Sequence, residues 1–374
     1  MDTEIINLID LAAKGLIPMF DAEKKIFCYR IVESKEGLVR EGISPRYTIM
    51  TLLGLLELER SGGRSSFDIK SLFQSFVSDT KWIRSGGDLG LLLWLYAAFA
   101  ADEIQGLVGR FHLADALKRF PDTREDRTME LAWFLAGLAH AAEVAPKSAG
   151  LFMYLARETY GRLKENQGSF GLFGHINTRK SLAGRLRGRI GSFADQIYPI
   201  YAFSKMATTF HMEEPLASAN KCAEAICRAQ GNMGQWWWLY DSVSGRVSSR
   251  YPVYSVHQHG MAPMGLFALE EAGGKSFREP IYKGLRWIYG NNEMGLDMRD
   301  TARSLIWRCV LPKEKRSKYL ETALSLVRPP AGDAHIGELK ILFEDRPYEL
   351  GWLLFAFSKH SVRPAEVTAS RSRQ

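Results

Sequence analysis

Apolar residues recur three and four positions apart along most of the chain, which is the spacing of helices that bury one face. In SPRYTIMTLLGLLELER, Ser44 is a candidate N-cap, Pro45 stands in the first turn, and SGG ends the segment. Similar patterns predict helices over residues 67–78, 86–103, 106–119, 127–145, 147–166, 192–210, 214–230, 256–272, 276–290, 298–309, 313–327, 334–344 and 346–360. Strand-like alternation is scarce, and its best example is the short GRVSSRYPVYSV. The pattern predicts an all-α protein of short-linked helices.

The domain organisation follows from the distribution of these helices over the 374 residues. No linker rich in Pro, Ser or Gly divides the chain. We therefore expect an N-terminal extension over residues 1–44 that packs on one continuous helical domain over residues 45–360. The polar residues 361–374 lack periodicity and are expected to form a flexible tail.

The amino-acid composition limits the classes of binding partner and the cellular compartment that the sequence predicts. The net charge of +7 suits an anionic ligand and leaves peripheral membrane contact open, but no dense basic stripe marks a nucleic-acid binder. The longest apolar run, LGLLLWLYAAFAA, has 13 residues, whereas a membrane-spanning helix needs roughly 20. The N-terminus has no basic region or cleavage site of a secretory signal. Four scattered cysteines are expected to be reduced thiols, so the sequence predicts a cytoplasmic protein.

A short motif occurs twice, 63 residues apart, each time after a predicted helix. QGSFGLF (167–173) and QGNMGQW (230–236) share the pattern Q-x-x-x-G-x-aromatic, and residues 291–295 carry a degenerate echo. The motif resembles the QW repeat of squalene and hopene cyclases, members of the terpenoid-cyclase and protein-prenyltransferase superfamily. That resemblance implies an α/α toroid, a double ring of inner and outer helices around a central cavity. It also implies structural roles, in which Gln caps a helix end beside the ring, for Gln167 with Phe173 and for Gln230 with Trp236.

The catalytic motifs of those families are absent from the sequence. Neither D-x-D-D nor D-D-x-x-D occurs, and no cysteine has a convincing set of zinc-binding partners. The same double ring is shared by unsaturated glucuronyl hydrolases, N-acylglucosamine 2-epimerases and several polysaccharide lyases. SFADQIYPIYAFSKMATTF and YPVYSVHQHGMAPMGLFAL resemble inner helices of these sugar enzymes. This second resemblance implies an active site at the N-terminal ends of the inner helices.

Three residues are the candidates for acid–base catalysis: Asp195, His257 and Tyr254. Asp195 opens an apolar helix, where it either faces the cavity or only satisfies the helix dipole. His257 and His259 form an H-x-H pair, which on an extended segment would direct both imidazoles to one side as half a metal site. No third ligand is evident, so we predict no metal and no cofactor. Ordinary polar residues at a helix entrance are the alternative.

Further residues are candidates for substrate binding. The repeat accounts for Trp236 but not for its neighbours, so one of the two following rings is expected to reach the cavity, whereas Asp241 either binds hydroxyls or caps its own turn. The basic run RKSLAGRLRGR is either a solvated loop or a lid over an anionic ligand. The binding candidates are Trp237, Trp238, Asp241, Tyr251, His259, Arg185, Arg187, Arg346 and Tyr348.

The sequence thus predicts an enzyme of saccharide or polysaccharide metabolism that acts by acid–base chemistry on a small or oligomeric, anionic sugar. Hydrolase, epimerase and lyase reactions stay open. A noncanonical terpenoid cyclase-like or isoprenoid-binding toroid is the alternative, and a non-catalytic helical scaffold is a third. The cavity lining discriminates among them, because an isoprenoid binder needs a dry pocket rimmed by the arginine run and a scaffold has a filled centre.

Overall fold

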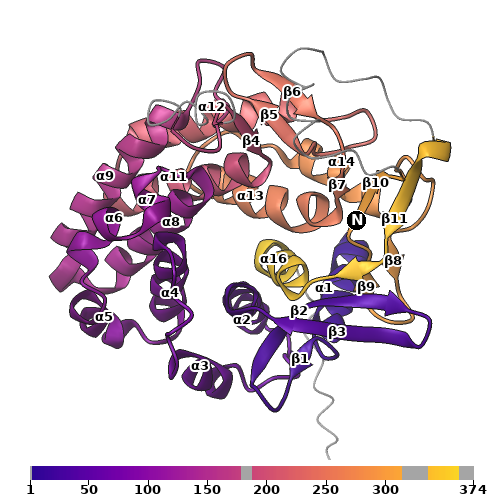
Figure 1. The fold of residues 1–374 in the computed structure, drawn as a ribbon, viewed down its shortest axis with the longest axis horizontal. Coiled ribbons are helices and arrows are strands. Elements are labelled where there is room, and N and C mark those ends of the chain that lie inside the picture. The colour runs from indigo at the N-terminus through magenta and orange to yellow at the C-terminus, as the bar shows by residue number, and fades with distance from the viewer. Residues whose placement is uncertain (1, 178–187, 314–335, 362–374) are drawn as a thin grey trace, which may run out of the picture.

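The computed structural model describes residues 2–177, 188–313 and 336–361. Helices form two concentric rings (Figure 1). The inner ring consists of α2 (Pro45–Arg60), α4 (Gly86–Phe99), α8 (Thr128–Val144), α11 (Ala194–Phe210), α13 (Ala262–Glu271), which follows a π-helical turn η4 (His257–Met261), and α16 (Pro347–Phe357). The outer helices are α3 (Ile69–Val77), α5 (Ile104–Arg110), α6 (Ala116–Arg119), α7 (Pro121–Arg124), α9 (Ala149–Asn166), α12 (Glu213–Arg228) and α14 (Arg278–Ile288). The predicted all-α toroid is confirmed.

The two rings differ in their apolar pattern. Helix α4 is apolar on all sides and is buried from Gly86 to Tyr96, as an inner helix surrounded by protein must be. Helix α12 instead buries a stripe that includes Ala219, Cys222 and Ile226, and it turns its charged face to solvent. Neighbouring inner helices pack very closely, since a Cβ on Gly137 of α8 would lie 2.0 Å from the carbonyl oxygen of Gly90 in α4.

Short strands connect the helices, and some of them replace predicted helices. The hairpin of β2 (Ile26–Ser34) and β3 (Gly37–Ile43) pairs with β1 (Phe20–Asp21) and with β12 (Glu344–Asp345). Two three-stranded sheets follow, one of β11 (Leu339–Leu342), β10 (Cys309–Pro312) and β7 (Val253–Tyr254), the other of β4 (Ile190–Ser192), β5 (Leu239–Asp241) and β6 (Arg246–Ser249). A further pair joins β8 (Arg299–Asp300) and β9 (Leu305–Ile306).

The helices predicted over 298–309 and 334–344 are therefore wrong. Residues 299–300 and 305–306 form a local strand pair, and residues 339–342 pair with residues 309–312. The helix predicted over 106–119 is broken at His112, whose φ is +44°. The segment 313–327 lies almost wholly outside the described residues.

The N-terminal residues lie against the C-terminal inner helix. Helix α1 (Asp2–Gly15) contacts α16, and Ile31 and Val32 of β2 pair with Asp345 and Glu344. The four cysteines are free thiols. In the described part of the chain, no helix combines the length and apolarity that crossing a membrane requires.

The two repeat motifs form the same turn twice. The Gln167 side-chain amide donates to the carbonyls of Gly171 and Ser218, and the Gln230 amide donates to those of Gly234 and Pro280. Ser218 and Pro280 belong to α12 and α14, so each glutamine side chain joins its turn to the next outer helix, and Gln167 is also the C-cap residue of α9. Phe173 and Trp236 are fully buried beneath these turns.

Candidate active site at the N-terminal ends of the inner helices

Every inner helix, or the turn that leads into it, begins with a polar side chain in its first turn. Contacts among these side chains and their neighbours show that the six helix starts lie at one end of the toroid, which we call the N-terminal mouth. The residues are Arg46, Asp88, Glu130, Asp195, His257 and Glu349. Acidic side chains are favoured there, because a helix N-terminus carries partial positive charge.

Arg46 connects three inner helices at the mouth. Its Nε lies 2.5 Å from Oδ1 of Asp88 and its Nη1 lies 2.9 Å from Oε1 of Glu130. Asp88 also closes a capping box with Ser85, which fixes the start of α4. The Arg46 guanidinium lies 5.0 Å from the centre of the Trp133 ring. Arg46 therefore balances two buried carboxylates that would otherwise repel each other.

A second ion cluster stands where α16 begins. Glu344 accepts from Arg30, Arg308 and Arg346, and Arg308 also pairs with Glu349. Burial raises the pKa of Glu349 to about 7, although Arg308 and Arg346 lower it. Its second oxygen, Oε2, is buried without a hydrogen-bond partner among the described residues. Glu349 is thus a carboxyl group that changes protonation near neutral pH.

The Asp195 carboxylate forms a dyad with a histidine. Its Oδ2 lies 3.1 Å from Nδ1 of His175 and accepts from the backbone N–H and hydroxyl of Ser192. Asp195 is 1% exposed, whereas the His175 side chain is 42% exposed. A buried carboxylate on one ring nitrogen orients an imidazole and presents its other face outward, an arrangement that suits proton transfer.

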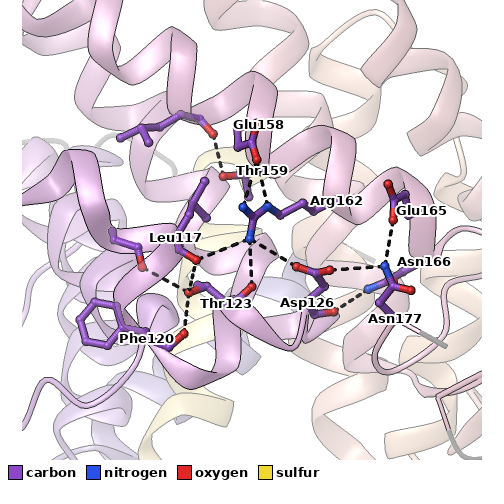
Figure 2. Close-up of polar contacts among 12 residues, drawn as sticks. Leu117, Phe120, Thr123, Asp126, Glu158, Thr159, Arg162, Glu165, Asn166 and Asn177 are labelled. Carbon is purple, nitrogen blue, oxygen red and sulfur yellow. Dashed lines mark hydrogen bonds and ion pairs between the residues drawn. The ribbon is translucent and has the colours of Figure 1, made fainter. Parts of the chain in front are cut away.

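A polar network holds the segment that carries His175 (Figure 2). Asn177 donates to Glu165 and Asp126, and Asp126 contacts Arg162 of α9. Closer to the mouth, the Thr128 N–H donates to the carbonyl of His175 at 3.0 Å. The start of α8 therefore fixes the backbone that positions the dyad.

Several of the predicted residues come together at the mouth. The Tyr254 ring lies 5.1 Å from the Trp238 ring and 5.2 Å from the His257 ring, and the Arg308 guanidinium lies 4.9 Å from Tyr254. On the other side of this cluster, Arg346 donates to the Tyr47 hydroxyl, and the Tyr348 ring stacks on Tyr47 at 4.4 Å. Of the two tryptophans beyond the repeat, Trp238 is the one beside a candidate catalytic residue.

The two histidines of the H-x-H motif differ from the prediction. They lie on the π-helical turn η4, not on an extended segment, because β7 ends at Tyr254. Burial lowers the pKa of both His257 and His259 to about 3, so both imidazoles are neutral at pH 7. His259 is fully buried and neither of its ring nitrogens has a partner in the described structure, so it lines no open surface. Within the described ranges, no group of three His, Cys, Asp or Glu side chains could hold a metal ion.

Three other predicted binding residues, Asp241, Trp237 and Tyr251, make contacts with nearby protein groups. The Asp241 carboxylate accepts from Arg189, from the Val243 N–H and from the Ser244 hydroxyl, which is the turn-capping alternative. Trp237 points away from Tyr254: its indole N–H donates to the Ala229 carbonyl, and its ring packs beside Tyr251. Arg185 and Arg187 lie outside the described residues.

Sequence reasoning missed Arg46, Asp88, Glu130, His175 and Glu349. For the three acids and Arg46 a signal was present, since each stands in the first turn of an apolar helix, as Asp195 does. His175 gave no such signal, because it lies in a loop and meets Asp195 only in the folded chain.

A cavity of about 470 Å³ lies at the C-terminal ends of the inner helices, the end opposite to the one at which the sequence predicted a cavity. An aromatic layer closes the ring between the two ends, with Trp133 against Tyr198 and with the Trp352 indole donating to the Tyr198 hydroxyl at 3.0 Å.

With this geometry established, the class of fold is clear: the chain is an α/α toroid of the kind found in sugar enzymes. Neither a protein family nor a curated protein matches the chain in sequence. Solved structures of several sugar enzymes are similar to it. A possible member of the GH105 family from Salmonella enterica serovar Paratyphi A has a TM-score of 0.60 and 9% identity, with 96% of this chain and 94% of that chain covered. An unsaturated glucuronyl hydrolase from Bacillus sp. GL1, responsible for glycosaminoglycan degradation, has a TM-score of 0.57 and 14% identity over 95% and 96% of the chains.

A sugar epimerase from a ruminal bacterium has a TM-score of 0.63 and 10% identity, and 97% of this chain and 100% of that chain are covered. At these identities the likeness shows the fold. These three structures give no support to the terpenoid-cyclase resemblance.

Proposed function

We propose that the protein is a saccharide-processing enzyme that uses acid–base chemistry at the N-terminal mouth. The observation that carries the proposal is the pair of proton-transfer groups found there. The exposed His175 is oriented by buried Asp195, and Glu349 has its pKa raised by burial to about 7. Acid–base catalysis works best when the pKa of a group lies near the working pH. The sugar enzymes that share the fold support the choice of substrate class.

The substrate that we propose is an anionic sugar, as the sequence predicts. Arg46, Arg308 and Arg346 stand at the mouth, each already paired with a protein carboxylate, and a substrate carboxylate would share these guanidinium groups. The Trp238 and Tyr254 rings beside Arg308 offer a surface on which the apolar face of a sugar packs. The substrate role of Trp238 and Tyr254 is part of this proposal.

The test is an activity screen with product analysis by NMR. The substrates are unsaturated uronyl disaccharides, N-acetylglucosamine and an acidic glycosaminoglycan, so that hydrolysis, epimerisation and elimination are each detected. We expect turnover of a uronate-containing substrate. Absence of turnover with every saccharide would contradict the proposal.

Substitutions then test which side chains transfer protons in the proposed reaction. We expect Glu349→Gln, Asp195→Asn and His175→Gln each to lower turnover about 10²-fold or more, the usual contribution of a proton-transfer group. The matched control is Glu213→Gln, which removes an exposed first-turn acid from outer helix α12. The activity of the unmodified protein should change with pH near 7, and that change should vanish in Glu349→Gln. If Asp195→Asn melts far below Glu213→Gln but keeps its activity per folded molecule, Asp195 caps its helix and is not a catalytic group.

A further inference from the structure

The cavity at the C-terminal ends of the inner helices is a second feature of the toroid that the mouth chemistry does not use. All six inner helices, with the short turn after α16, contribute to its wall, and four alanines, Ala97, Ala98, Ala268 and Ala272, leave its volume open. A volume of about 470 Å³ is in the range of small-molecule sites, roughly 300–1,000 Å³.

The floor of this cavity is aromatic but carries a polar edge. Trp94 stacks on His140 at 4.7 Å and on Tyr201 at 4.8 Å, and Phe355 meets Trp94 edge-on. His140 Nε2 lies 2.8 Å from the Tyr201 hydroxyl. Burial lowers the pKa of His140 well below its ordinary value, so the imidazole is neutral. The floor therefore combines aromatic carbon surface with uncharged hydrogen-bonding groups.

The rim carries charge, but it is balanced. Glu57 lies 2.8 Å from Arg60, Glu143 lies 2.7 Å from Lys205, and Glu271 lies 2.7 Å from Lys359. Each charged side chain that lines the cavity thus has a partner of opposite sign. An ionic ligand would meet both signs on the rim, whereas a hydroxyl group can donate to a carboxylate and accept from an ammonium group.

We propose that this cavity binds an uncharged pyranose unit, with its apolar face on the aromatic floor and its hydroxyls toward the rim. The site goes beyond the proposed function, because the aromatic layer of Trp133, Tyr198 and Trp352 separates it from the mouth. It is a binding site and not a second active site.

The test measures binding of methyl glucoside, methyl galactoside and N-acetylglucosamine to the full chain. Binding is measured by ligand-observed NMR and by calorimetry, and glucuronate is the charged comparison. Ala268→Leu should fill the cavity and weaken binding about tenfold or more, which corresponds to about 1.4 kcal/mol. Tyr201→Phe removes only the hydroxyl and should weaken binding less. Ala225→Leu on outer helix α12 is the matched control and should leave binding unchanged.

Binding in the cavity should not depend on catalytic turnover at the N-terminal mouth. Glu349→Gln should retain the cavity binding even if turnover is lost, and Ala268→Leu should retain turnover of a substrate that fits the mouth alone. The proposal is overturned if no neutral pyranoside binds, if Ala268→Leu binds as tightly as Ala225→Leu, or if glucuronate binds more tightly than the neutral sugars. Failure of the mouth activity with intact cavity binding would overturn only the proposed function.

Discussion

Burial shifts the pKa of acidic side chains and the pKa of histidines in opposite directions in the inner ring. It raises the pKa of the Glu349 carboxyl to about 7 and lowers the pKa of the His259 imidazole to about 3, because a low-dielectric surrounding disfavours the charged form of each. Glu349 keeps a charged partner in Arg308, whereas neither ring nitrogen of His259 has a partner in the described part of the chain. Glu349 therefore changes protonation near pH 7, whereas His259 is neutral at that pH.

We predict that His259 makes the fold sensitive to acid. A histidine whose folded-state pKa is lowered contributes its full stability above its ordinary pKa, and that stability is lost as the pH falls below it. With a folded pKa of about 3, the lost contribution of His259 between pH 7 and pH 5 is about 2 kcal/mol. His259→Leu should therefore lose less free energy of unfolding over this interval, as measured by urea denaturation at each pH.

The control is His211→Asn. His211 is exposed and has a φ of +52°, a conformation that asparagine adopts readily, so this variant should keep the acid sensitivity of the unmodified protein. Identical pH dependence in the His259→Leu and unmodified chains would show that His259 is not the acid-sensitive group.

At the scale of the elements, the repeated turn explains how neighbouring hairpins keep their spacing. Gly171 and Gly234 have φ values of +93° and +97°, and a Cβ there would lie 2.5 Å from the Lys221 carbonyl oxygen and 2.2 Å from that of Lys283. The Q-x-x-x-G spacing therefore reflects a turn that must approach the next outer helix closely. This requirement depends on few residues, which is why the repeat is visible in sequence.

We predict that Gln167 and Gln230 stabilise the fold to a similar degree. Gln230→Met keeps the length of the side chain but removes the amide that donates to Gly234 and Pro280. Loss of both bonds should lower the free energy of unfolding by about 1–3 kcal/mol, and Gln167→Met should have an effect of the same size. Chemical denaturation measures the difference.

Gln74→Met on exposed outer helix α3 serves as the reference, because its change should stay within about 0.5 kcal/mol. Equal stability of the Gln230→Met and Gln74→Met chains would show that the repeat glutamine does not join the hairpins energetically.

At the scale of the whole molecule, ring closure brings charges from distant parts of the chain together. Arg46, Asp88 and Glu130 come from three inner helices, and Arg30 and Glu344 are 314 positions apart. Such pairs do not drive folding, since desolvation of each charge offsets most of their attraction. Removal of one partner is costly, because the remaining charge stays buried.

We therefore predict that Arg46→Met destabilises the entire toroid. Asp88 and Glu130 would lose the cation between them, at a cost of about 2–4 kcal/mol in the free energy of unfolding. The matched variant is Arg286→Met on outer helix α14, where the side chain is exposed and the cost should be within about 0.5 kcal/mol. Thermal and urea unfolding of both variants test the difference, and similar stability would mean that Arg46 is only a surface ion pair.

In the candidate site, local features could be predicted from the sequence, but contacts between distant residues could not. Asp195 was predicted as a candidate because a first-turn acid on an apolar helix is a local feature, and the same rule applies to Asp88, Glu130 and Glu349. The extended form assigned to His257 and His259 was wrong because strand β7 stops two residues earlier than its apolar pattern suggests. The helix assigned to 334–344 failed because its strand pairs with residues 309–312 elsewhere in the chain, whereas the helix assigned to 298–309 is replaced in part by a local strand pair.

The sequence by itself determined the helical periodicity and the repeated glutamine turn, because each depends on residues within a few positions of one another. The toroid was implied only by the resemblance of that repeat to known families. Only the tertiary structure decided which side chains meet. It joined His175 to Asp195, raised the pKa of Glu349, and placed the open cavity at the end of the ring opposite to the predicted one. Contacts, burial and empty volume depend on side chains that are distant in sequence, so no local pattern specifies them.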